Sequence, residues 1–160
     1  VSDLLLLAQE SIDTVRTISE DLRPGALDHL GLRTALDAML RQFSERTELA
    51  CRLEAVDDDI RLSQPRATAV YRICQEALTN IARHAEARRV SVRLRCTNGL
   101  LHLDIEDDGR GLVSLTPTGK SLGLLSMAER AREFGGALRS QPGAMGGTCL
   151  TLCLPMEEPL

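Results

Sequence analysis

The chain has 160 residues, of which 43% are hydrophobic and 26% charged, a composition that suits one domain with a buried core. Aromatic residues make up only 2%, so we expect a core of Leu, Ile, Val and Ala. The net charge of -4 argues against a broad nucleic-acid surface, and no apolar run approaches the ~18 residues of a membrane-spanning helix.

Residues 3–22 are predicted to form an amphipathic helix. Leu5 and Ile12 widen a heptad seam in which residues recur at spacings of four and three, namely Leu4, Ala8, Ser11, Val15, Ile18 and Leu22. The sequence Arg-Pro-Gly at 23–25 then separates this helix from the rest of the chain. We therefore favour self-association of the helix in a bundle over packing on its own domain.

The segments up to residue 84 predict two further helices and a strand. A helix is expected from about Leu32 within residues 27–47, and the apolar run at 49–56 reads as a strand. Ser63 is a plausible N-cap for the next helix, which has Pro65 in its first turn and runs to about His84.

The second half of the chain predicts four strands and a helix. Strands at 89–97 and 100–107 are joined by Asn-Gly, the strongest short hairpin signal. A loop rich in Gly, Ser and Thr at 109–122 precedes a helix, and two last strands are expected at 137–141 and 148–155. This order of elements predicts an α+β fold, a two-layer sandwich with a largely antiparallel sheet.

Polar side chains recur at every fourth position of the helix that ends near residue 84. Glu76, Asn80 and His84 therefore share one face of that helix. The carboxylate and amide oxygens of the first two suit Mg²⁺, which usually takes its remaining ligands from phosphates and water. Most polar pairs at this spacing are only a solvated stripe, so the spacing alone leaves both interpretations open.

Three glycine motifs follow in the second half of the chain. In Asp107-Asp108-Gly109-Arg110-Gly111, the first Asp can accept a hydrogen bond from an exocyclic amine such as adenine N6, and the glycines allow close backbone approach. Glycines at 119–123 precede a helix, whose N-terminal N–H groups favour phosphate. Gly-Gly-Thr at 146–148 opens the final strand. One such loop is weak evidence, whereas these motifs in this order predict a nucleotide site.

Together the four motifs resemble those of the GHKL ATPases. The N box is matched by QEALTNIARHA (75–85), the G1 box by EDDGRGL (106–112), the G2 region by SLGLLSMAER (121–130) and the closing motif by GGT (146–148). The preceding DLRPGALDHLGLRTAL (21–36) resembles the junction in sensor histidine kinases of the branch that includes the nitrate/nitrite sensors. The resemblance covers almost the whole chain and implies a Bergerat-type ATP-binding sandwich.

The resemblance also implies roles for individual residues. Asn80 would be the Mg²⁺ ligand, Glu76 the acid acting at the γ-phosphate of ATP, and Asp107 the partner of the adenine amine. Gly109 and Gly111 would shape the adenine pocket. Further contacts with the nucleotide are implied for Arg83, His84, Lys120, Gly123, Leu124 and Thr148, with Gly123 beginning the helix beside the lid at 112–122.

Two departures from the family pattern stand out. Ser126 occupies a position where the pattern has glycine, which would stiffen the lid region. The family's phosphoacceptor is a His followed by an acidic residue on an upstream helix, and His29, His84 and His102 all lack that context. We therefore interpret residues 1–24 as part of a dimerisation bundle and residues 25–160 as the catalytic domain, which would bind ATP without autophosphorylation.

For the intact protein, the resemblance implies a homodimer, a response regulator of the LuxR-like type and a cytoplasmic location, with any inner-membrane anchor in upstream segments. Direct nucleic-acid binding is not expected. Two alternatives stay open. One is a GHKL serine kinase of the anti-sigma-factor type, which the junction and the heptad helix disfavour. The other is a non-catalytic dimerisation and nucleotide-sensing module.

The five cysteines are an odd number and include no CxxC pair. We interpret them as small hydrophobic residues in a reducing compartment. A metal site formed by Cys149, Cys153 and a distant His is the less favoured alternative.

Overall fold

The computed structural model describes residues 2–22, 25–56, 60–111 and 119–156. Its elements follow one another as α1 (Ser2–Leu22), α2 (Gly25–Thr47), β1 (Ala50–Ala55), α3 (Gln64–Asn80), the π-helix η1 (Ile81–Ala85), β2 (Arg89–Thr97), β3 (Leu100–Asp107), α4 (Gly119–Glu133), β4 (Ala137–Pro142) and β5 (Thr148–Pro155). The expected α+β sandwich is confirmed.

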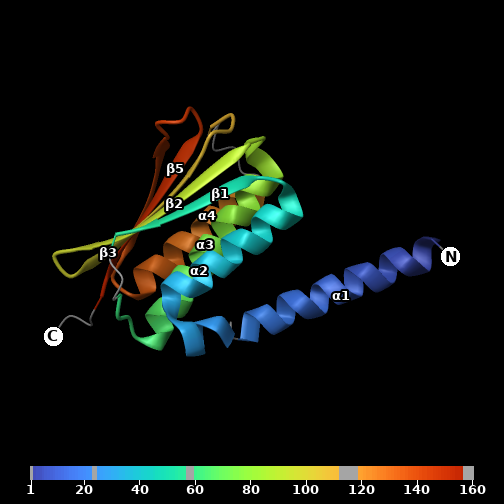
Figure 1. The fold of residues 1–160 in the computed structure, drawn as a ribbon, viewed down its shortest axis with the longest axis horizontal. Helices are drawn as coiled ribbons and strands as arrows, with labels where there is room; N and C mark the ends of the chain where they lie inside the picture. Colours follow the sequence, from blue (N-terminus) through green and yellow to red (C-terminus); the bar gives the residue numbers. More distant parts are fainter. Residues whose placement is uncertain (1, 23–24, 57–59, 112–118, 157–160) are drawn as a thin grey trace.

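The five strands form one mixed sheet in the order β1-β2-β3-β5-β4. Only β1 and β2 run parallel, and the other neighbours are antiparallel. Helices α2, α3 and α4 cover one face of this sheet, as Figure 1 shows. The functional motifs on α3, β3, α4 and β5 are thereby brought to the interface between the two layers.

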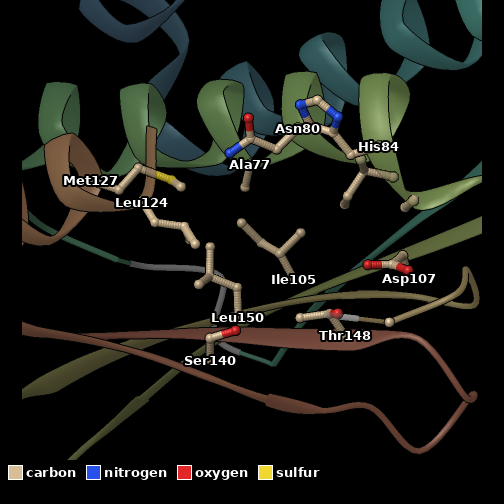
Figure 2. A pocket seen from close by; sticks show the side chains of 13 residues that line it. Ala77, Asn80, His84, Ile105, Asp107, Leu124, Met127, Ser140, Thr148 and Leu150 are labelled. Atoms are coloured by element: carbon tan, nitrogen blue, oxygen red, sulfur yellow. The ribbon is translucent and has the colours of Figure 1, made fainter. Parts of the chain in front are cut away.

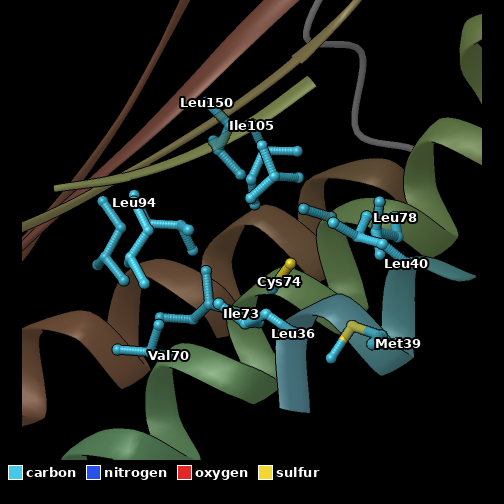
Figure 3. Packing of buried hydrophobic residues seen from close by; sticks show 14 of the residues in the cluster. Leu36, Met39, Leu40, Val70, Ile73, Cys74, Leu78, Leu94, Ile105 and Leu150 are labelled. Carbon is cyan, nitrogen blue, oxygen red and sulfur yellow. The ribbon is translucent and has the colours of Figure 1, made fainter. Parts of the chain in front are cut away.

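The core lies between the helices and the sheet and is aliphatic, as the composition predicts. Alternate residues of β3 face the helices, and Leu101 and Leu103 are fully buried there. They belong to one core cluster with Leu36 and Ile73, which are equally inaccessible. Figure 3 shows these two helical residues facing Leu94 and Ile105 of the sheet. Burying each such side chain contributes roughly 1.5–3 kcal/mol. Among the described residues, Phe43 is the only buried aromatic.

The β2–β3 hairpin forms where the sequence predicts it. Asn98 and Gly99 adopt φ values of 54° and 74°, the two positive φ angles of a type I′ turn. This turn fixes the register that pairs Leu94 with Leu103 and Val90 with Asp107. The hairpin therefore delivers Asp107 to the end of β3 beside the start of β2.

The predicted starts of three helices can be compared with the structure. The helical segment α2 already begins at Gly25, but Gly31 interrupts it with φ 82° and ψ 170°, so the regular helix starts close to the predicted Leu32. Ser63 does occupy the N-cap of α3, although its side chain makes no capping hydrogen bond. The predicted start of α4 is wrong, because this helix begins at Gly119 rather than near residue 122.

Helix α1 extends away from the layered part of the molecule (Figure 1). Leu4 and Val15, two members of the heptad seam, are 72% and 61% exposed. No helix in the described part of the chain is long and apolar enough to cross a membrane. The part of the seam whose side chains are described is therefore accessible to another helix.

The cysteines are all free. Cys74 is buried in α3, and burial raises the pKa of its thiol to about 12. The other four lie in strands, as predicted. Among the described residues, no group of three His, Cys, Asp or Glu side chains could hold a metal ion, which leaves the Cys149–Cys153 alternative without support.

Candidate functional site

A pocket opens between the α3–η1 segment and the sheet. It encloses about 620 Å³ of space including its open mouth. Its lining comprises Ala77, Asn80, Ile81, His84, Ala85, Ile105, Asp107, Gly111, Leu124, Met127, Ser140, Thr148 and Leu150.

The pocket has an apolar middle and polar groups on two sides. In Figure 2, Asn80 and His84 project from the helical side, whereas Asp107 and Thr148 lie on the strands opposite. The aliphatic side chains of Ile105 and Leu150 lie beside them on the sheet. A slot of this kind suits a flat ring with one exocyclic polar group, attached to a more polar tail.

Asp107 is the buried carboxylate of the pocket, with 4% of its surface exposed. Its Oδ1 accepts a hydrogen bond from the backbone N–H of Gly109 at 2.8 Å. Burial raises the pKa of this carboxyl group, and hydrogen bonds from the backbone N–H groups of Gly109 and Thr148 offset part of the rise. Gly147 packs on the same residue so closely that a Cβ there would collide with the Asp107 carboxylate.

Asn80 and Glu76 lie under the second turn of α4. A Cβ placed at Gly123 would come within 2.7 Å of Glu76 Oε1 and 3.2 Å of Asn80 Nδ2. Gly123 therefore packs closely on these two side chains, and a larger residue there would displace the Glu76 carboxylate. The expectation that Gly123 begins the helix is wrong, because α4 starts four residues earlier, at Gly119.

The helix predicted to run to His84 is not a regular α-helix over its whole length. Regular α-helix ends at Asn80, and residues Ile81–Ala85 form a π-helix that stops at Glu86, whose φ is 52°. Wide turns of this kind are rare and occur frequently at functional sites. Asn80 and His84 thus flank the point where the helix widens, and both line the pocket.

Asp108 fastens the start of β2 to the end of β3. Its Oδ1 accepts the backbone N–H groups of Arg88 and Arg89 at 2.8 and 2.9 Å, and Arg89 Nε approaches Oδ2 at 3.2 Å. These hydrogen bonds, with the nearby guanidinium, lower the pKa of the Asp108 carboxyl group. The residue acts on the turn and does not line the pocket.

The structure brings six of the predicted site residues into the pocket lining: Asn80, His84, Asp107, Gly111, Leu124 and Thr148. Glu76 and Gly123 contact each other just beyond it, Gly109 packs against Ala85, and Arg83 is exposed. The backbone of Lys120 lies in the first turn of α4, but its side chain falls outside the described residues. The lid was predicted at 112–122; its residues 112–118 also fall outside the described residues, and residues 119–122 are helical rather than loop.

Sequence reasoning missed the apolar lining. Ile105 lies two residues before Asp107 on one face of β3, and Leu150 lies two residues after Thr148 on one face of β5, so alternation could have identified both. Ser140 was not detectable in this way. It reaches the pocket because β4 pairs it with Leu150.

Comparison with known proteins agrees with this geometry. Residues 66–158, more than half of the chain, match the family model "Histidine kinase-, DNA gyrase B-, and HSP90-like ATPase". The chain is 38% identical over 148 residues to the sensor histidine kinase MctS of Rhizobium johnstonii. That match covers 91% of this chain and 32% of MctS, so the chain spans about a third of its relative.

Solved structures show the same fold. The ATP-binding domain of PrrB from Mycobacterium tuberculosis has a TM-score of 0.61 at 22% identity, covering 79% of this chain and 94% of that one. The Acinetobacter baumannii histidine kinase AdeS has a TM-score of 0.67 at 16% identity, covering 95% and 85%. The family match, the pocket and the shared fold agree: the chain belongs to the histidine kinase-, DNA gyrase B- and HSP90-like ATPases and contains an ATP-binding catalytic domain of the sensor histidine kinase type.

Proposed function

We propose that this domain transfers the γ-phosphoryl group of ATP to a His on a dimerisation helix outside the chain, for relay to the Asp of a response regulator. The observation that carries the proposal is the placement of buried Asp107 across an apolar slot from Asn80 and His84. The carboxylate would accept a hydrogen bond from the adenine amine, and the aliphatic side chains would hold the ring.

The polar groups on the helical side suit the triphosphate. Asn80 offers an amide oxygen for Mg²⁺, and Glu76 places a carboxylate one helical turn away, where it would orient the attacking group. Mg²⁺ neutralises phosphate charge during phosphoryl transfer, a reaction that depends mainly on positioning. His84 lines the pocket beside Asn80, and Arg83 and Lys120 would contribute positive charge.

The phosphoacceptor is expected outside this chain. His84 belongs to the nucleotide pocket, and His102 lies on the outer face of β3 opposite Cys153. His29 follows the Arg-Pro-Gly segment rather than standing before an acidic residue on an upstream helix. The isolated chain should therefore bind ATP without phosphorylating itself, and a stable phosphohistidine on it would contradict this.

The same proposal extends to the intact protein and its partner. Residues 1–24 would form part of a dimerisation bundle and residues 25–160 the catalytic unit, in a homodimeric kinase of the nitrate/nitrite-sensor branch. Support comes from the exposed apolar seam of α1 and from the junction sequence at 21–36. The partner would be a LuxR-like response regulator, and the domain would work in the cytoplasm, where ATP is available.

Calorimetric titration with a non-hydrolysable ATP analogue, with and without Mg²⁺, tests the site. Asp107→Asn should abolish binding, whereas Asp104→Asn, on the outer face of the same strand, should bind like wild type. Asn80→Ala should lose mainly the Mg²⁺-dependent part, and its neighbour Thr79→Ala should not. Equal binding by Asp107→Asn and wild type would show that the Asp107 carboxylate does not hold the adenine amine.

A further inference from the structure

Arg110 holds both backbone carbonyls at the end of the π-helix. Its backbone N–H donates to the carbonyl of Ala85 at 2.8 Å, and its side-chain Nε donates to the carbonyl of His84 at 3.0 Å. Carbonyls at a helix end lack partners within the helix, and a positive side chain there is favourable. One residue from the β3 turn thus caps η1 across 26 positions of sequence.

The turn that contains Arg110 also packs closely against the end of η1. Gly109 packs against Ala85 so tightly that a Cβ would collide with the Ala85 carbonyl. The Arg110 guanidinium also approaches the exposed carboxylate of Glu86, at 3.7 Å. The turn that follows Asp107 and the end of η1 are therefore one packed unit.

This unit joins the two sides of the pocket. His84 lies on the helical side and Asp107 on the sheet side, and both line the cavity (Figure 2). A π-helical turn is rare and is found frequently at functional sites. The bonds made by Arg110 hold the last two carbonyls of this turn.

We propose that Arg110 is a positioning residue, whose guanidinium holds the π-helix so that His84 and Asp107 keep their separation across the pocket. The inference rests on the proposed roles of these two residues in binding ATP. It assigns to Arg110, which stands between Gly109 and Gly111, a task separate from contact with the nucleotide, since Arg110 does not line the pocket.

The test compares Arg110→Met with Arg93→Met. Arg93 is a close match, because its Nε donates to Glu54 Oε2 at 3.1 Å and its side chain is 53% exposed against 51% for Arg110, but it lies on the outer face of the sheet. We expect Arg110→Met to weaken binding of the ATP analogue about tenfold and Arg93→Met to leave it unchanged. Both variants should keep Tm within about 3 °C of wild type. Arg110→Lys should recover part of the affinity.

A second measurement needs no nucleotide. The chain has three histidines, so the imidazole C–H signals of His84 can be assigned in NMR spectra with His29→Gln and His102→Gln variants. Arg110→Met should shift the His84 signals, and Arg93→Met should not. Unchanged His84 signals in Arg110→Met, or binding equal to that of Arg93→Met, would overturn the inference. If wild type itself fails to bind, the proposed function fails, and the His84 signals still decide the role of Arg110.

Discussion

Asp107 and Asp108 are neighbours at the end of β3, yet their carboxyl pKa values shift in opposite directions. Burial raises the pKa of Asp107, whereas hydrogen bonds from the backbone N–H groups of Arg89 and Arg88 lower that of Asp108. The first side chain lines the pocket and the second fastens the turn. The ionised Asp107 should therefore reduce stability, and the ionised Asp108 should increase it.

For Asp107→Asn we predict a gain in stability at neutral pH together with the loss of nucleotide binding. A raised folded-state pKa gives stability that is present below the unfolded pKa and lost as the pH rises through the folded value. The asparagine avoids this loss and keeps an oxygen for the Gly109 N–H. Urea unfolding of both proteins at pH 7 and pH 3 checks this, since the advantage should vanish at pH 3. A less stable variant at pH 7 would contradict it.

For Asp108→Asn we predict the opposite effect, a loss of stability at neutral pH. A lowered folded-state pKa gives stability that is present above the unfolded pKa, near 3.9, and lost as the pH falls through the folded value. The variant should be less stable than wild type at pH 7, and the difference should shrink below about pH 4. Thermal unfolding across pH 2–7 would show the convergence. A difference that stays constant over that range would indicate lost packing instead.

Gly123→Ala should weaken nucleotide binding about tenfold with little change in fold stability. The added methyl group would displace Glu76 Oε1 and press on Asn80 Nδ2, the groups proposed to act at the phosphates. The fold loses little because the end of the Glu76 side chain can move and alanine favours the helix by about 1 kcal/mol. Calorimetry measures the binding and urea unfolding the stability. Ser126→Ala, at an exposed position of α4, is the control and should bind like wild type.

Leu103→Ala should destabilise the fold by about 2–5 kcal/mol, because the side chain is fully buried between the sheet and the helices. Leu125→Ala removes the same atoms from a position that is 52% exposed, and should change the unfolding free energy by less than about 0.5 kcal/mol. Urea unfolding of the two variants beside wild type gives the comparison. Similar losses in both would place Leu103 outside the core.

The seam of α1 should mediate self-association. Leu4 and Val15 are largely exposed on the described chain, and replacing both with Gln should shift the monomer–dimer equilibrium toward monomer at least tenfold. Sedimentation velocity over a range of protein concentrations measures this, with Asp3→Asn on the same helix as the control. A wild-type chain that stays monomeric throughout would show that α1 alone does not suffice.

The sequence predicts most of the fold because its local signals are strong. Two residues, Asn98 and Gly99, specify the type I′ turn and hence the β2–β3 register, and alternation marks the inward face of each strand. The motifs on α3 and β3 likewise bring Asn80 and Asp107 to one pocket.

The features that the sequence did not reveal depend on distant contacts. The π-helix at Ile81–Ala85 carries no local signal, and its last carbonyls are held by Arg110, far along the chain. Ser140 enters the pocket only through the pairing of β4 with β5. The start of α4 was misplaced because Gly119 to Gly123 have the composition of a loop, although the structure makes them helical.

The parallel pairing of β1 with β2 makes α3 and η1 the crossover of a β-α-β unit. The two strands hold both ends of this connection. The number of residues in it therefore determines the direction in which each helical side chain points. Each residue of an α-helix turns the chain by about 100°. Deleting one residue between Ser63 and Asn80 would therefore carry the amide out of the pocket while both strands stayed in place.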